Sequence, residues 1–140
     1  MTRPFLTIDE LEKRRDFGPS RVRLAEDELA AFRRITNTSP DSEASNCIPQ
    51  GMCGVFLRWS YLQEYEMPPG GIITGLDFHF RETLPVDEDL HIAAKIDKID
   101  RSHTRYPRVQ IASSVSDANS RILQAATLRA RWPMKEQKDA

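Results

Sequence analysis

The alternation of apolar and polar residues in the second half of the chain predicts four β-strands. Apolar side chains recur at every second position in four stretches, at residues 72–80, 90–97, 109–115 and 122–132. A period of two places these side chains on one face of each strand, as in an antiparallel sheet with one buried face. Turn residues at 117–120 separate the last two strands, and Asp87 with Glu88 separates the first two. The four strands are therefore expected to follow one another as an antiparallel meander.

Apolar spacings of three and four residues in the first half predict two helices. Residues 26–35 carry Leu29, Phe32 and Ile35 at helical spacing, and acidic residues fill the first turn, where they favour the positive end of the helix dipole. Residues 49–62 begin with a proline and are apolar on most of the helix circumference. Such a helix must be wrapped by other elements, so the sheet is expected to surround it. A polar loop is expected between the two helices.

The first 20 residues are polar, charged and interrupted by proline and glycine, so an irregular lead-in with one helical turn from Asp9 is expected. A first strand is expected at residues 21–24. One domain over residues 21–134 is predicted, since 140 residues with 39% apolar composition support a single core. Residues 135–140 are expected to form a frayed tail.

Charge and composition exclude several classes of function. The formal net charge is −1 with acids and bases interspersed, so no nucleic acid or anionic membrane is expected as a partner. Arg101, Arg105 and Arg108 surround His103 and would suit a phosphorylated cofactor, although a solvated loop is the commoner origin of such a cluster. The two cysteines lack zinc-site spacing, so no metal is predicted. The absence of a signal-peptide core and of an apolar run of about 20 residues predicts a cytoplasmic protein.

A motif after the first helix carries a family resemblance. Residues 32–43 read FRRITNTSPDSE, and three further segments follow in order, IPQGM at 48–52, PGGIITGLDFHF at 69–80 and LPVDEDL at 84–90. Together they resemble the MaoC-like (R)-specific enoyl-CoA hydratases, in which a helix end runs into Thr-Gly-Asp-x-Asn-Pro-x-His. The resemblance implies an α+β hotdog fold, a single domain whose curved antiparallel sheet wraps around a long buried helix.

The catalytic aspartate and histidine of the family are replaced in this motif. Asn37 and Ser42 stand where the pair would be, and the loop that leads to Gly51 is shorter than in active relatives. Addition of water across a carbon–carbon double bond needs an acid and a base. A carboxamide has no basic site near neutral pH, and a serine is no base unless another residue activates it. The chain is therefore predicted to lack the family's acid–base pair.

The entry to the buried helix is the predicted substrate-binding site. In the family the glycine at this entry helps form an oxyanion site, so Gln50, Gly51 and Met52 are predicted to line the thioester site. The alternative is that Gly51 only permits close helix-to-sheet packing. Asp41 and Glu43 flank the serine of the motif and are candidate carboxylates for a thioesterase, although most such residues are simply solvated.

Other titratable residues give weaker signals. Glu64 and Glu66 follow the buried helix and are further candidate carboxylates. His79 and His91 alternate away from the core faces of their strands, so they are expected to face solvent or a subunit interface. His103 lies in a predicted turn and has no identifiable partner.

The resemblance and the missing pair predict a structural, acyl-thioester-binding subunit of an enoyl-CoA hydratase or 3-hydroxyacyl dehydratase. No cofactor is expected beyond CoA or an acyl carrier that holds the substrate. An uncovered sheet edge favours pairing, either as a hotdog homodimer or with a catalytically intact MaoC-like subunit. The alternatives are an active hydratase or dehydratase, a thioesterase or cyclase that uses unconventional residues, and a homodimeric acyl-thioester binder.

Overall fold

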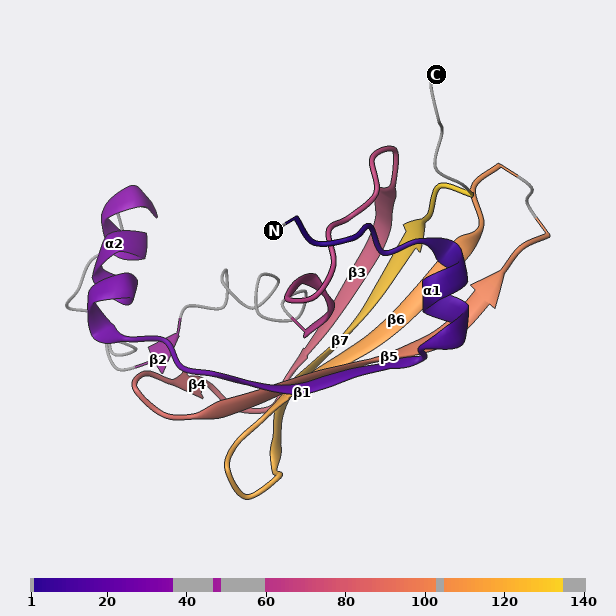
Figure 1. Cartoon of the computed structure of the whole chain (residues 1–140). Helices are drawn as coiled ribbons and strands as arrows, with labels where there is room; N and C mark the ends of the chain where they lie inside the picture. Colours follow the sequence, from indigo (N-terminus) through magenta and orange to yellow (C-terminus); the bar gives the residue numbers. More distant parts are fainter. Residues whose placement is uncertain (1, 37–46, 49–59, 103–104, 135–140) are drawn as a thin grey trace.

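A curved five-stranded antiparallel sheet forms the framework of the protein (Figure 1). The computed structural model describes residues 2–36, 47–48, 60–102 and 105–134. The strand order is β1-β5-β6-β7-β3, and a separate two-stranded sheet pairs β2 with β4. The strands are β1 (Asp16–Val22), β2 (Cys47–Ile48), β3 (Ile72–Phe80), β4 (Leu84–Pro85), β5 (Leu90–Asp100), β6 (Arg108–Ser116) and β7 (Ile122–Arg131).

Two helices flank this sheet. Helix α2 (Glu26–Thr36) confirms the predicted first helix and lies beyond one end of the sheet, at the left of Figure 1. Helix α1 (Ile8–Lys13) contacts β5 and lies at the opposite side of the view. None of the described helices is long and apolar enough to cross a membrane. Residues 60–62 are helical, whereas the rest of the predicted buried helix lies outside the described residues.

The N-terminal segment is part of the core, so the expected irregular lead-in is wrong for most of its length. The side chain of Thr7 caps α1 by accepting a hydrogen bond from the backbone N–H of Glu10 at 3.3 Å. Ile8 and Leu11 of α1 are buried, and β1 begins at Asp16 instead of residue 21. The helical turn expected from Asp9 is confirmed by α1, whereas its burial was not predicted, because a short helix with two buried residues gives little periodicity.

The expected meander is correct for β5, β6 and β7 and wrong for β3. Strand β3 pairs with β7 at the edge of the sheet, with Leu76 opposite Leu128. The predicted turn at residues 117–120 is the hairpin between β6 and β7. Asp87, by contrast, lies in a crossing connection that includes β4, and its backbone N–H donates to the Leu24 carbonyl at 2.9 Å. A polar loop was expected up to Ile48, but Cys47 and Ile48 form the short strand β2, which pairs with β4.

Two groups of buried side chains fill the concave face of the sheet. One lies beside α2 and includes Leu29, Leu84 and Ile92. The other includes α1, Tyr61 and Trp132. The inward row of alternate residues on β5, β6 and β7 is buried as predicted, because each strand lies between two hydrogen-bonded neighbours and under a covering layer. Ile122 at the start of β7 is the exception, because it is 41% exposed beside the hairpin turn. The predicted one-sided sheet is therefore confirmed for these three strands.

Candidate functional site

An apolar pocket opens on the concave side of the sheet, between residues 61–73 and β7. It has a volume of about 390 Å³, and its lining includes Tyr61, Met67, Pro68, Ile73, Leu128 and Trp132. Of the residues that line it, only an arginine carries a charge, and none is acidic or a histidine. A pocket of this size and polarity suits the alkyl part of a small ligand.

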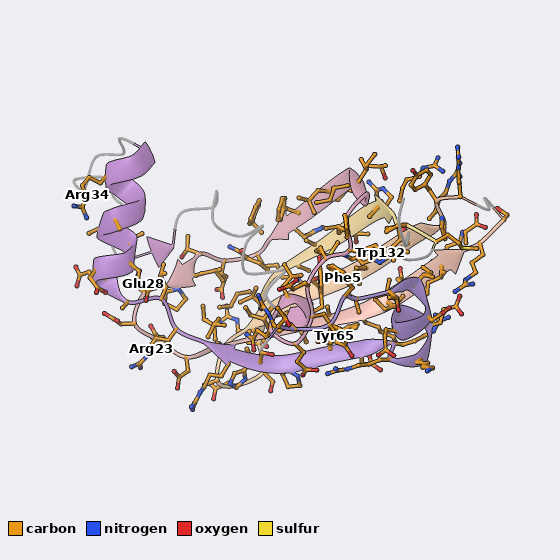
Figure 2. All side chains as sticks on the ribbon, turned by 45° about the horizontal axis from the view of Figure 1, so that its top comes forward. Phe5, Arg23, Glu28, Arg34, Tyr65 and Trp132 are labelled. Carbon is orange, nitrogen blue, oxygen red and sulfur yellow. The ribbon has the colours of Figure 1, made fainter. Side chains whose placement is uncertain are left out.

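Aromatic side chains hold the wall of this pocket in place. The ring of Tyr61 packs edge-on against Phe17, with centroids 6.1 Å apart, and Phe17 packs in the same way against Tyr65. Trp132 is fully buried and donates its indole N–H to the Leu6 carbonyl at 2.8 Å. Figure 2 shows Tyr65 and Trp132 in the part of the molecule away from α2. The pocket is therefore bounded by side chains that have little freedom to move.

Strand β3 borders the pocket and forms an exposed edge of the sheet. It pairs only with β7, so one row of its backbone N–H and C=O groups has no strand beside it among the described residues. Ile72 is 63% exposed, Ile73 45%, and Leu76 and Phe80 each 40%. The sequence pattern placed Ile72, Leu76 and Phe80 in the core, and this expectation is wrong because no described element covers them. An exposed apolar edge of this kind is typical of an association surface.

The residues predicted to replace the catalytic pair lie outside the described residues. Asn37, Asp41, Ser42 and Glu43 follow the end of α2 and precede β2. Their roles stay predictions. The predicted thioester site lies in the same region of the sequence, directly after β2.

Gln50, Gly51 and Met52 also lie outside the described residues, so their contact with a thioester stays a prediction. The chain that leads to them is fixed in space, because Ile48 of β2 pairs with Leu84 of β4. Leu84 is fully buried against the core beside α2. Ile48, the last described residue before the predicted site, therefore lies at the same end of the sheet as α2.

Glu64 is held in an ion pair and is not poised as a general base. The guanidinium of Arg14 forms two hydrogen bonds with its carboxylate, one of them at 3.2 Å from Nη2 to Oε1. These hydrogen bonds lower the pKa of Glu64, whereas a base for neutral pH needs a raised pKa. Arg14 also lies over the ring of Phe17, 4.9 Å from its centroid. The pair therefore joins the end of α1 to the segment after residue 62.

The described histidines lie away from the concave site. His79 is exposed and His91 is half-buried, at positions that alternate with the inward residues of β3 and β5, as the sequence predicted. His103 lies outside the described residues. Within the described ranges, no group of three His, Cys, Asp or Glu side chains is arranged to hold a metal ion. His79 and His91 therefore supply no acid or base to the apolar pocket.

Gln124 is a buried polar residue that the sequence interpretation did not single out. It is 1% exposed and lies between Val115 of β6 and Phe80 of β3. Its side-chain NH₂ donates to the Glu82 carbonyl at 3.3 Å, and its Oε1 has no hydrogen-bond partner among the described residues. The signal in the sequence was a single amide in an otherwise apolar inward row. Gln124 does not line the apolar pocket, so its role is one of packing and of holding the Glu82 carbonyl.

The sheet curvature, strand order and covered concave face define a hotdog domain, which confirms the predicted fold class. The structure is similar to the monoamine oxidase regulatory protein from Archaeoglobus fulgius, with a TM-score of 0.75 and 10% identity over 96% of this chain and 99% of that chain. It is also similar to the MaoC-like dehydratase from Rhodospirillum rubrum, with a TM-score of 0.67 and 16% identity over 86% and 91% of the two chains.

A third similar structure is the C-terminally truncated HadBC (3R-hydroxyacyl-ACP dehydratase) complex from Mycobacterium tuberculosis. Its TM-score is 0.66, with 11% identity over 83% of this chain and 93% of that chain. No family model and no curated protein matches the chain by sequence. The likeness to MaoC-like dehydratases is therefore one of structure and of the sequence segments described above.

Proposed function

We propose that this protein is a MaoC-like hotdog subunit that binds an acyl thioester and pairs with a catalytically intact hotdog subunit. Together the two chains would act as an enoyl-CoA hydratase or 3-hydroxyacyl dehydratase. The observation that carries the proposal is the exposed apolar edge formed by β3, directly beside the apolar pocket. The similarity to the HadBC complex supports assembly with a second chain.

The edge of β3 favours a partner that also forms a strand. A strand placed beside β3 would satisfy its free backbone groups, and it would cover Ile72, Ile73 and Leu76. Burial of aliphatic side chains of this size contributes about 1.5–3 kcal/mol each when it is complete. Association through this edge is therefore favourable both for the backbone and for the side chains.

The apolar pocket supports binding without catalysis. Tyr61 and Trp132 provide a rigid apolar wall for an acyl chain, and the pocket lining contains no acid–base pair. The thioester carbonyl would lie near the entry to the helix at Gly51, with CoA or an acyl carrier as the substrate carrier and no other cofactor. Asn37 and Ser42 at the family's catalytic positions explain why the acid and base must come from the partner.

The test uses the purified chain alone and mixed with a MaoC-like hotdog chain that retains the catalytic aspartate and histidine. Native mass spectrometry measures association, and hydration of crotonyl-CoA measures activity. Activity only in the mixture is the expected result. Hydration by the chain alone at an enzyme-like rate would overturn the proposal.

A charge on the edge strand tests the proposed interface directly. Leu76→Lys places a charge in the contact, so association should weaken by about tenfold or more. His79→Lys is the matched control, because His79 is exposed on the same strand at a position of the opposite face. Equal association of both variants and the unmodified chain would show that β3 is not the interface.

A further inference from the structure

A second pocket lies mainly on the convex face and shares Ala130 and Arg131 of β7 with the apolar pocket. It has a volume of about 350 Å³, and its lining includes Thr74, Lys98, Arg108, Gln110, Arg129 and Arg131. These side chains alternate with inward residues such as Val109 and Ala130, which places them on the outer face. The pocket therefore gathers four cationic side chains from three neighbouring strands.

The register of the strands brings the cations together. Lys98 of β5 is opposite Gln110 of β6, which is opposite Arg129 of β7. In the next row, Arg108 of β6 is opposite Arg131 of β7. Directly opposed side chains have Cβ atoms about 4.5–5.5 Å apart, and like charges in such pairs are destabilising. Arg108 and Arg131 therefore repel each other across the two strands, and a bound anion would relieve this repulsion.

One carboxylate offsets part of this positive charge, because Asp100 of β5 lies directly opposite Arg108. Among the described residues, Lys98, Arg108 and Arg131 form no ion pair. Asp100 is the only acidic residue in the lining, and its carboxylate accepts the backbone N–H of Ser102 at 2.9 Å. The three unpaired cations less this one carboxylate leave a net charge of about +2, which matches a dianion.

The fourth cation forms a fixed wall of the pocket. Arg129 pairs with Asp77 at 2.6 Å and lies across Gly75, where a Cβ atom would come within 2.9 Å of Nε. Gly75 follows a register shift in β3, and the hydroxyl of Thr74 beside it adds a hydrogen-bond donor to the lining. The cationic rows, the wall and the donor thus enclose one small volume.

We propose that this convex-face pocket binds a phosphoryl group, as a phosphate or diphosphate dianion. Two guanidinium groups and one ammonium group offer charge-assisted hydrogen bonds in geometries that match phosphate oxygens. A nucleic acid is a poorer fit, because the cations are confined to one pocket on a chain of net charge −1. The site does not depend on the proposed function.

The arginine cluster that the sequence suggested around His103 differs from the cations that line this pocket. Arg101 is paired with Asp9 at 2.8 Å and with Glu12 at 2.6 Å, so it is unavailable to an anion. Arg105 is exposed and is absent from the pocket lining. Only Arg108 of that cluster contributes to the pocket, together with residues far away in the sequence.

Isothermal titration of the purified protein with inorganic pyrophosphate tests the site, with acetate at matched ionic strength as the control anion. Saturable binding of pyrophosphate, and none of acetate, is expected. Arg108→Gln and Lys98→Gln should each weaken binding by about tenfold, because each removes a charge-assisted interaction. Arg105→Gln is the matched control, and binding should change by less than about twofold, since surface charges act weakly at a distance.

Absence of saturable binding by the unmodified protein would overturn the proposal, as would equal weakening by Arg105→Gln. If Arg108→Gln lowers the melting temperature, its weaker binding could reflect partial unfolding, and the result for Lys98→Gln then decides whether the site exists. Lys98 is exposed and forms no ion pair among the described residues, so its substitution should leave the fold intact. Titration with coenzyme A and with inorganic phosphate then distinguishes the source of the phosphoryl group. Competition of coenzyme A with pyrophosphate, lost in Lys98→Gln, supports a CoA-borne group, whereas binding of phosphate and pyrophosphate alone supports a free anion.

Discussion

Replacement of Trp132 by phenylalanine should destabilise the protein by about 2–5 kcal/mol. The indole N–H is the donor to the Leu6 carbonyl at 2.8 Å, and both residues are fully buried. Phenylalanine leaves this carbonyl without a partner, which costs about 1–3 kcal/mol. The smaller ring also leaves a cavity, which adds about 1–2 kcal/mol because the surroundings relax only partly.

This change is measurable by urea and thermal unfolding. For a domain of this size each kcal/mol lowers the melting temperature by about 3–4 °C, so a decrease of about 6–20 °C is expected. Phe5→Leu is the control, because Phe5 adjoins Leu6 but is 37% exposed, and its substitution should cost less than about 1 kcal/mol. A cost below about 1 kcal/mol for Trp132→Phe would show that the N-terminal segment does not depend on this contact.

Three further substitutions test the packing around the concave face. Gly18→Ala should cost about 2–4 kcal/mol, because the φ of Gly18 is +84° and an added Cβ would lie 2.5 Å from a backbone carbonyl oxygen of β5. Gly70→Ala is the control and should cost only about 1 kcal/mol, because Gly70 has a φ of +94° but no atom near its Cβ position. Equal urea midpoints for the two variants would contradict this reasoning. Leu11→Ala should cost about 2–4 kcal/mol by urea unfolding, and a neutral result would return α1 to the status of a dispensable lead-in. Glu64→Gln should cost less than about 1 kcal/mol at pH 7, because the carboxylate is 60% exposed. Arg14 lowers the pKa of Glu64 in the folded state, so the stabilisation by this ion pair is complete above about pH 5 and is lost as the pH falls through the folded pKa. A difference in stability between Glu64→Gln and the unmodified protein that persists at pH 2 would contradict this explanation.

The sequence predicted an element correctly where the periodicity of that segment alone shows which of its faces is buried. The alternation of Ile92 with its neighbours on β5, and of Ile111 with its neighbours on β6, predicted strands that the structure confirms. Helix α2 was equally readable from its acidic first turn and its apolar spacing. These signals depend on local periodicity, which is retained in any fold that buries the same face.

Partners that are distant in sequence were not readable. Nothing in the alternation of β3 states that it pairs with β7 instead of β5, because both arrangements bury alternate residues. Strand β1 was hidden for another reason, since a register shift between Phe17 and Ser20 interrupts its period of two. The convex-face cations were not predicted for the same reason as the β3 pairing, because Arg108 and Arg131 become neighbours only through strand order.

The edge strand β3 shows how far an apolar pattern can be interpreted. Its residues Leu76 and Phe80 are as regularly spaced as those of the buried strands, yet each is 40% exposed. A side chain that is buried by a partner chain gives the same sequence pattern as one buried within its own domain, because both lose the same contact with water. The core prediction is wrong for β3 within the described residues, and the apolar pattern of this strand is what the proposed association surface requires.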